Sequence, residues 1–268
     1  MHKIQHNYNF TRLWIIISVL FVLGTSNTAL ASAAESNTEE LIVGVPTDRC
    51  PVFYQDQDTN EIVGIGTDLM RIAAEEAGYH VIFQAITEKS LKDALDNNAY
   101  DVVLPFGSAV SSSSGKASIV SDNLFRTPFT LVTVNDRKLP PLNDLQVGML
   151  RSLAGGAETV SQLYPGIRIV FYDNMDDSVK ALRHDDADAL LHNSYVWSYV
   201  LQKPLYSDLS VQPSAMFSMD FRVGTLDTAE GHEIIVRLNE GIISMTDPPA
   251  SGDYFRLHFK TSLSKYIF

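Results

Sequence analysis

Few residues of the chain have the types and spacing that chemistry needs. The run SSSSGKA beginning at Ser111 resembles a phosphate loop, but it lacks the Gly-Lys-Ser/Thr sequence that such loops use. Ser113 has no His and Asp partner near it in sequence, which argues against a serine nucleophile. Cys50 is the only cysteine of the chain, which excludes an intrachain disulfide, and we interpret it as a small packing residue.

Metal ligation has equally little support. The acidic cluster from Asp185 to Asp188 is typical of a turn with a solvated face rather than of a calcium loop. The histidines after residue 31 stand at no metal-ligand spacing and are His80, His184, His192, His232 and His258. We therefore expect no metal, no cofactor and no catalytic residue. Among these histidines only His192 stays a candidate for a functional role, because it precedes Asn193 at the end of a predicted strand.

The composition is that of an acidic globular protein. The chain has 268 residues, of which 45% are hydrophobic and 19% charged, and its formal net charge is −12. These values exclude a fully disordered protein. The length fits one large domain or two small lobes. The negative charge argues against nucleic acid and anionic membrane surfaces as the main partners.

The first 31 residues have the pattern of a secretory signal peptide. Lys3 and Arg12 precede the apolar run 13–23, and an Ala-Leu-Ala cleavage sequence at 29–31 follows it, with a second small-x-small option at 31–33. The run is too short for a spanning helix, which needs about 20 residues. An uncleaved N-terminal anchor is the alternative. We expect the remaining chain to be secreted across the cytoplasmic membrane, into the periplasm or onto the cell surface.

Strand and helix patterns alternate along the rest of the chain. Short apolar runs predict strands at 41–45, 81–86, 101–105, 130–134, 167–172, 188–191 and 217–225. A helix is predicted over 66–80, with Thr67 or Asp68 as its cap. A second, long amphipathic helix contains Ile235 to Met245, and Gly241 is its weak point.

This alternation predicts an α/β fold with parallel sheets covered by helices on both faces. Two such units joined by extended crossings form two lobes with a cleft between them, and small ligands favour such clefts. We expect the following parts along the chain: a signal peptide over 1–31, a polar linker over 32–39, the first part of lobe 1 over 40–133, lobe 2 over 134–215, and a return to lobe 1 with a C-terminal helix and tail over 216–268.

Several of these segments together resemble the family 3 extracellular solute-binding proteins, which have the type II periplasmic binding protein fold. The resemblance rests on LIVGVPTDRCPVF, VGIGTDLMRIAAEEAGYHVIF, LKDALDNNAYDVVLP, LQVGMLRS and SVKALRHDDADALLHNSYV, and it covers about 40–245. It implies two lobes, a hinge of two crossing strands, and closure over a solute.

The amino-acid binders of this family clamp a zwitterion, and the resemblance implies which residues here take those positions. The stacking aromatic position falls on Cys50, with Phe53 close by. In the loop after the third strand Ser108 is kept, but Phe106 replaces a small polar residue. The carboxylate-binding arginine falls on Ser113 or Ser114. The second-lobe residues at the other clamp positions are Leu153 and Ala154 for a small-hydroxyl pair, and Asn193 for an aspartate.

The strongest charge-assisted contacts of that clamp are therefore missing. We expect a small polar solute that is not a standard α-amino acid. Arg126 or Arg151 could supply a replacement cation. The predicted ligand-binding residues are Phe53, Phe106, Ser108, Arg151 and Asn193.

Two functions fit this reading. The first is a free solute-binding protein that serves a membrane permease of an ABC importer. The second is the ligand-sensing input module of a membrane receptor, a histidine kinase or a diguanylate cyclase, whose signalling output module would be the partner. The stretch LLHNSYVWSYVLQKPLYSDLSVQP resembles that sensor branch more than importer proteins. A remote third function is an enzyme similar to cyclohexadienyl dehydratases, but no paired carboxylates stand at predicted strand ends.

Overall fold

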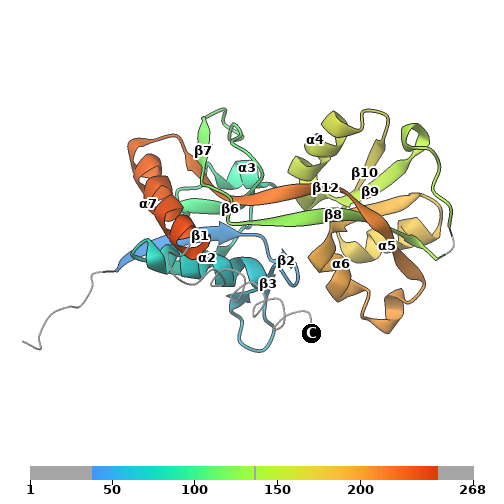
Figure 1. The fold of residues 1–268 in the computed structure, drawn as a ribbon, viewed down its shortest axis with the longest axis horizontal. Helices are drawn as coiled ribbons and strands as arrows, with labels where there is room; N and C mark the ends of the chain where they lie inside the picture. Colours follow the sequence, from blue (N-terminus) through green and yellow to red (C-terminus); the bar gives the residue numbers. More distant parts are fainter. Residues whose placement is uncertain (1–37, 136, 247–268) are drawn as a thin grey trace, which may run out of the picture. The chain divides into compact units, whose positions relative to one another are not determined.

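A computed structural model describes residues 38–135 and 137–246 of the chain. These residues form an α/β fold with two lobes, joined by a pair of long strands (Figure 1). The predicted fold class is therefore confirmed. The predicted signal peptide, most of the linker and the C-terminal tail lie outside the described residues. The lobe boundaries given above stay a prediction.

The first lobe is built on a parallel core of three strands. They stand in the order β6 (Val102–Phe106), β1 (Glu39–Val45), β5 (Tyr79–Ala85). The last five residues of β1 are apolar or glycine and mostly buried, as is typical of a parallel strand covered on both faces. The remaining elements of this lobe are β2 (Asp48–Arg49), β3 (Phe53–Gln55), β4 (Ile62–Val63), α2 (Ile65–Glu76), α3 (Leu91–Ala94), β7 (Ser118–Val120) and α7 (Ala229–Thr246).

The second lobe repeats the pattern. Its parallel strands stand in the order β10 (Arg168–Tyr172), β9 (Gln146–Leu150), β11 (Ala189–Asn193). The helices of this lobe are α4 (Ala154–Leu163), α5 (Met175–Arg183) and α6 (Ser194–Val200). Short 3-10 turns complete it: η1 (Leu142–Asp144), η2 (Arg151–Leu153) and η3 (Pro204–Tyr206). Asn174 caps α5 by accepting from the backbone N–H of Asp177, which satisfies one of the free donors of the first turn.

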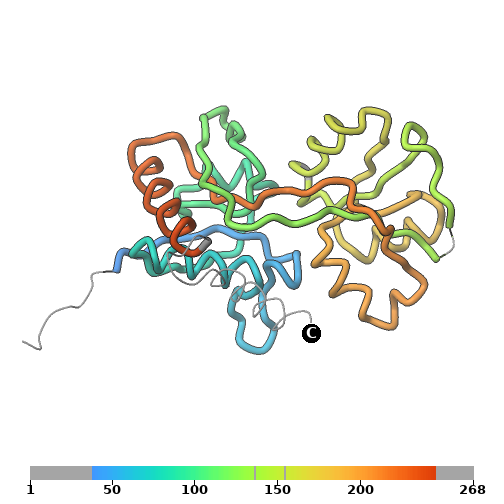
Figure 2. The backbone as a smooth tube through the Cα atoms, viewed as in Figure 1, coloured from blue at the N-terminus to red at the C-terminus, as the bar shows by residue number. Residues whose placement is uncertain are grey.

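The two lobes are joined by the antiparallel ribbon of β8 (Phe125–Val134) and β12 (Leu209–Leu226), which run side by side in Figure 2. β8 pairs with β11 in the second lobe. β12 pairs with β8 up to Phe221 and with β6 from Arg222 onward, so it passes from one sheet into the other. The expected hinge of two crossing strands is therefore present. Sequence patterns predicted only the parts 130–134 and 217–225 of these strands.

Two local expectations are wrong. Helix α2 begins after Gly64, and Thr67 lies inside it, where its hydroxyl donates to the Gly64 carbonyl instead of capping the helix. Gly64 has φ 142°, which favours glycine, and a Cβ there would collide with the Val52 carbonyl. Gly241 is not a weak point of α7, because a side chain there would meet the Ala73 carbonyl of α2. It lets the two helices approach closely.

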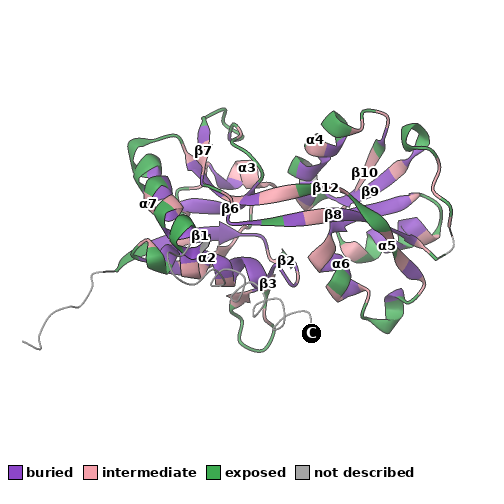
Figure 3. Cartoon of the chain, in the orientation of Figure 1, coloured by how far each residue is buried: buried purple, intermediate pink, exposed green. Residues whose placement is uncertain are grey.

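Burial follows the layers: the strands β6 and β11 are buried along their whole length, β12 is exposed over part of its middle, and the helices expose their outer faces (Figure 3). Trp197 of α6 is fully buried and donates its indole N–H to the Thr130 carbonyl at 3.1 Å, which ties α6 to β8. Within the described ranges no helix is long and apolar enough to span a membrane.

Candidate functional site

A cleft of about 470 Å³ is lined by residues of both lobes and of the β8–β12 ribbon. The first lobe contributes the segment around Phe106 and Ser108, which follows β6, and part of α3. The second lobe contributes the segment after β9 and the first turns of α4. The cleft therefore lies at the carboxyl ends of strands β6 and β9, where open α/β folds place their ligands.

Three of the five predicted site residues line this cleft: Phe106, Ser108 and Arg151. Phe106 is mostly buried, and its ring lies where a Cβ on Gly224 would have to go, so it packs against β12. Arg151 is exposed and donates from Nε to Asp173 at 2.9 Å. Because both side chains of this pair are solvated, it holds Arg151 only weakly at the rim.

The other two, Phe53 and Asn193, are fully buried and are not among the residues that line the cleft. Phe53 fills the space beside Gly66 and stacks on Phe221 at a centroid distance of 6.3 Å. It therefore packs in the first lobe. Asn193 ends β11 and caps α6 by accepting from the backbone N–H of Val196 at 2.8 Å. Its side-chain Nδ2 has no hydrogen-bond partner among the described residues.

The serine run lies elsewhere. Ser114 donates from its backbone and its hydroxyl to the Asp96 carboxylate, and the Ser113 N–H donates to the Lys92 carbonyl. None of Ser112, Ser113 and Ser114 lines the cleft. The run is thus anchored to the α3 region. Ser113 and Ser114, which the resemblance put at the carboxylate-binding position, therefore do not face the cleft.

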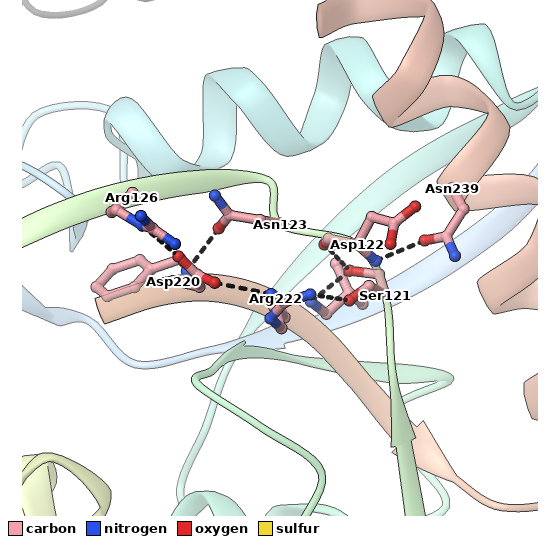
Figure 4. Close-up of polar contacts among 9 residues, drawn as sticks. Ser121, Asp122, Asn123, Arg126, Asp220, Arg222 and Asn239 are labelled. Atoms are coloured by element: carbon pink, nitrogen blue, oxygen red, sulfur yellow. Dashed lines mark hydrogen bonds and ion pairs between the residues drawn. The ribbon is translucent and has the colours of Figure 1, made fainter. Parts of the chain in front are cut away.

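Arg126, Asp220 and Arg222 form a saturated group on the ribbon, which we call the hinge cluster (Figure 4). Asp220 accepts from Arg126 Nε at 2.6 Å and from Arg222 Nη2 at 2.7 Å. The hydrogen bond from Arg126 is the main cause that holds the pKa of Asp220 below its usual value, and burial opposes it. Arg222 also donates to the Ser121 carbonyl. Arg126 and Asp220 line the cleft, but each already has a charged partner.

Arg49 is the residue that sequence reasoning missed. It is 3% exposed, belongs to β2 of the first lobe and lines the cleft. Its Nη2 donates across the cleft to the Ser152 carbonyl of the second lobe at 2.6 Å. Its Nε lies 3.5 Å from Asp48 but has no hydrogen-bond partner in the described chain. Burial lowers the pKa of Arg49, and the Asp48 charge opposes that shift. The signal in the sequence was a lone arginine just after a predicted strand.

His192 lies at the end of β11, next to Asn193, and is 1% exposed. Burial is the main cause that lowers its pKa to about 3, and the nearby Arg49 charge adds to the effect. The ring is therefore neutral at ordinary pH. Its Nδ1 accepts from the Asn193 N–H at 2.8 Å, so the ring proton is on Nε2, and that atom is buried without a partner.

Arg49, Ser152, His192 and Asn193, which we call the inner cluster, hold all four of the buried side-chain polar atoms found unpaired in the described residues. Ser152 follows β9, and His192 and Asn193 end β11. These two strands are parallel neighbours, so the three residues share one edge of the second-lobe sheet. Arg49 reaches this edge from the first lobe. Buried polar groups are normally paired, so four unpaired ones at one edge need a physical explanation.

The charges of the cleft differ from those of the chain. Among the described residues that line it, four are basic (Arg49, Lys92, Arg126, Arg151) and two are acidic (Glu158, Asp220). Lys92 of α3 and Glu158 of α4 pair across the cleft at 3.2 Å. Since the whole chain carries −12, the surplus of positive charge is local to the cleft and favours an anionic group there. No group of three His, Cys, Asp or Glu side chains in the described chain is placed to hold a metal.

Comparison with known proteins agrees with this architecture. Residues 41–194 match the bacterial extracellular solute-binding proteins, family 3. The arginine-binding extracellular protein ArtP of Bacillus subtilis is 27% identical over 188 residues, which are 66% of this chain and 71% of that protein. A substrate-binding protein of an ABC uptake transporter from Streptococcus pneumoniae, solved with histidine, superposes with a TM-score of 0.65 and 18% identity, covering 87% of this chain and 95% of the other.

A periplasmic domain of another protein has the same fold. The periplasmic domain of B. pertussis BvgS superposes with a TM-score of 0.65 and 18% identity, covering 85% of this chain and 43% of that one. At such identities these structures establish the fold alone, whereas the family match spans more than half of the chain. The chain belongs to the bacterial extracellular solute-binding proteins of family 3.

Proposed function

We propose that the protein captures a small polar solute between its two lobes, makes and breaks no covalent bond, and delivers the solute to the membrane permease of an ABC importer. The observation that carries the proposal is the cleft of about 470 Å³, lined by both lobes and by the ribbon that joins them. Its volume suits a small molecule. The family's description as extracellular supports a site of action outside the cytoplasm.

Closure is the mechanism that this arrangement favours. Arg49 and Lys92 of the first lobe contact Ser152 and Glu158 of the second, so the lobes meet across the cleft. A solute that touches both lobes stabilises the state in which they meet, and a permease reads that state. Small-angle scattering tests this step. We expect the radius of gyration to fall at saturating ligand, and an unchanged value at saturation would contradict closure.

A standard α-amino acid is a poor match for the cleft, although the B. subtilis protein is named for arginine and the S. pneumoniae protein was solved with histidine. An ammonium group needs a free acceptor. Both acidic residues of the cleft are engaged, Glu158 by Lys92 and Asp220 by Arg126 and Arg222. At the aspartate position of the resemblance Asn193 offers an unpaired donor, because its oxygen caps α6.

A thermal-shift screen over amino acids, amines, peptides, sugars and organic acids tests the function. A ligand at 100 times its dissociation constant adds about 2.7 kcal/mol of stability, which is easily detected. We expect at least one class to raise the melting temperature. A tight standard amino acid would contradict the exclusion of zwitterions, and the absence of any shift at millimolar concentrations would contradict the binding function.

A sensory input module is the second candidate, and the shared fold of the BvgS periplasmic domain favours it. Deleting the gene in the source bacterium separates the two roles. An importer component is required for uptake of the labelled solute. A sensor is required for the transcriptional response to that solute, whereas uptake continues without it.

A further inference from the structure

Arg49 makes a buried contact between the two lobes. Its Nη2 donates to the main-chain carbonyl of Ser152 at 2.6 Å, and Arg49 is only 3% exposed. Lys92 and Glu158 also pair across the cleft, but their side chains are 42% and 60% exposed, so water and salt screen that pair. A charge-assisted hydrogen bond that is shielded from water is stronger than a solvated ion pair. Arg49 therefore makes the stronger of these two contacts.

The residue after Arg49 meets the second lobe as well. Arg49 belongs to β2, which pairs with β3 inside the first lobe, so its backbone moves with that lobe. The Cys50 thiol lies against the Tyr199 hydroxyl of α6 in the second lobe. Ser152 follows β9, so the acceptor of Arg49 and Tyr199 belong to different elements of the second lobe. The segment 49–50 thus contacts the second lobe at two places, and both contacts break when the lobes part.

Closing the lobes has a cost at the same place. Arg49 Nε and Ser152 Oγ are buried without a hydrogen-bond partner in the described chain. Water reaches such atoms when the lobes are apart, so closing removes that water and gives these two atoms no bond in return. Burial also lowers the pKa of Arg49, which reflects the same cost. Because desolvation opposes the bond to Ser152, we expect that bond to favour closure without locking the lobes together.

We propose that Arg49 is the positioning residue for closure, and that its bond to the Ser152 carbonyl is an interlobe latch that sets how much of the ligand-free protein is closed. This rests on the proposed capture by closure and adds a contact that acts before any solute arrives. A closed form that is already partly populated lowers the free energy that a solute must supply to complete closure. Because the latch is weak, the lobes still open and admit the solute.

Double electron–electron resonance on the ligand-free, purified chain measures the latch. Nitroxide labels are attached at Lys89→Cys, just before α3, and at Ser161→Cys on α4, two exposed positions, in a Cys50→Ser background. Because α3 and α4 contact each other across the cleft, the distance between the labels grows when the lobes open. We expect a short and a long distance. Arg49→Met should lower the ratio of the short to the long population about threefold, a factor within what one hydrogen bond contributes.

Three further variants separate the latch from general effects of substitution. Ser152→Ala leaves the carbonyl acceptor in place, so the ratio should not fall. Arg168→Met makes the same change as Arg49→Met at an exposed position of β10 outside the cleft and should leave the ratio unchanged. Arg49→Lys keeps a charged donor without the planar fork and should restore part of the short-distance population. Circular dichroism verifies that each variant is folded.

An unchanged ratio in folded Arg49→Met overturns the latch, and so does an equal loss in Ser152→Ala. The measurement uses no solute, so a failed latch leaves the solute-binding function standing, to be decided by the thermal-shift screen. A screen without any ligand contradicts capture, whereas the ratio still reports whether Arg49 holds the lobes together. The two failures are therefore distinguishable.

Discussion

The hinge cluster and the inner cluster use the same side-chain chemistry in opposite ways. In the hinge cluster two arginines share one carboxylate, and Arg222 adds a backbone carbonyl. In the inner cluster Arg49 has one interlobe hydrogen bond, and four polar atoms have none. A saturated cluster stabilises the fold, because breaking it leaves charges unpaired. An unsaturated cluster stabilises the fold little, because its polar atoms are desolvated without gaining partners. The comparison separates the two clusters into a group whose charges are paired and a group whose buried donors are unpaired.

The largest effect on stability should come from breaking the hinge cluster. Asp220→Ala leaves the partly buried Arg222 without its carboxylate, so the free energy of unfolding should fall by about 2 kcal/mol, and the Arg126 pair adds little because that side chain is 65% exposed. Urea denaturation measures this. Asp58→Ala removes a carboxylate from an exposed turn and should change stability by less than about 0.5 kcal/mol. Equal effects of the two variants would contradict a structural role for the hinge cluster.

His192 gives the next largest effect, and it depends on pH. Its pKa is about 3 in the folded protein and about 6.5 when unfolded, so the unfolded state binds more protons between these values and stability falls as the pH is lowered. The charged groups that act on it are Arg49 and Asp48. Between pH 7 and pH 5 its share of the loss is about 2 kcal/mol.

His192→Gln should remove that share, because an amide does not titrate. The measurement compares the unfolding free energy of both proteins at pH 7 and pH 5. Carboxylates with lowered pKa, such as Asp220, contribute the same losses to both proteins and cancel in the difference. If both proteins lose equal stability over this range, His192 is not buried as a neutral ring.

The same two clusters show how far the sequence alone could lead. Strands such as β1 and helices such as α2 were predictable, because their apolar spacing is a local property. β2 has only two residues, too few for any periodicity, so the one local sign of Arg49 was its place just after a predicted strand. Phe53 stands near the predicted ligand position in sequence, but it fills the space that Gly66 leaves open and stacks on Phe221. Which polar atoms stay unpaired depends on contacts between lobes, which a single sequence does not encode locally.

Arg49→Met should affect stability less than either variant above. It removes a buried charge that has one hydrogen bond, and an apolar side chain of similar length fills the space, so the free energy of unfolding should change by no more than about 1 kcal/mol in either direction. Urea denaturation of both variants without ligand compares the loss of stability of Arg49→Met with that of Asp220→Ala. A loss as large as that of Asp220→Ala would mean that Arg49 stabilises the fold as the hinge cluster does, and would remove the contrast between the clusters.

The smallest effect should come from the ion pair of Lys92 and Glu158, which joins the lobes across the cleft. Its side chains are 42% and 60% exposed, so the pair contributes less than about 1 kcal/mol to the closed state. Lys92→Gln should therefore weaken ligand binding no more than about fivefold, and 1 M salt, which screens charges beyond about 3 Å, should remove the difference. Glu158→Gln should have a similar effect, and the double variant should add nothing to either single one, because each breaks the same contact. Additive losses in that cycle would mean that the two side chains act independently, so that their ion pair does not join the lobes in the ligand-bound state.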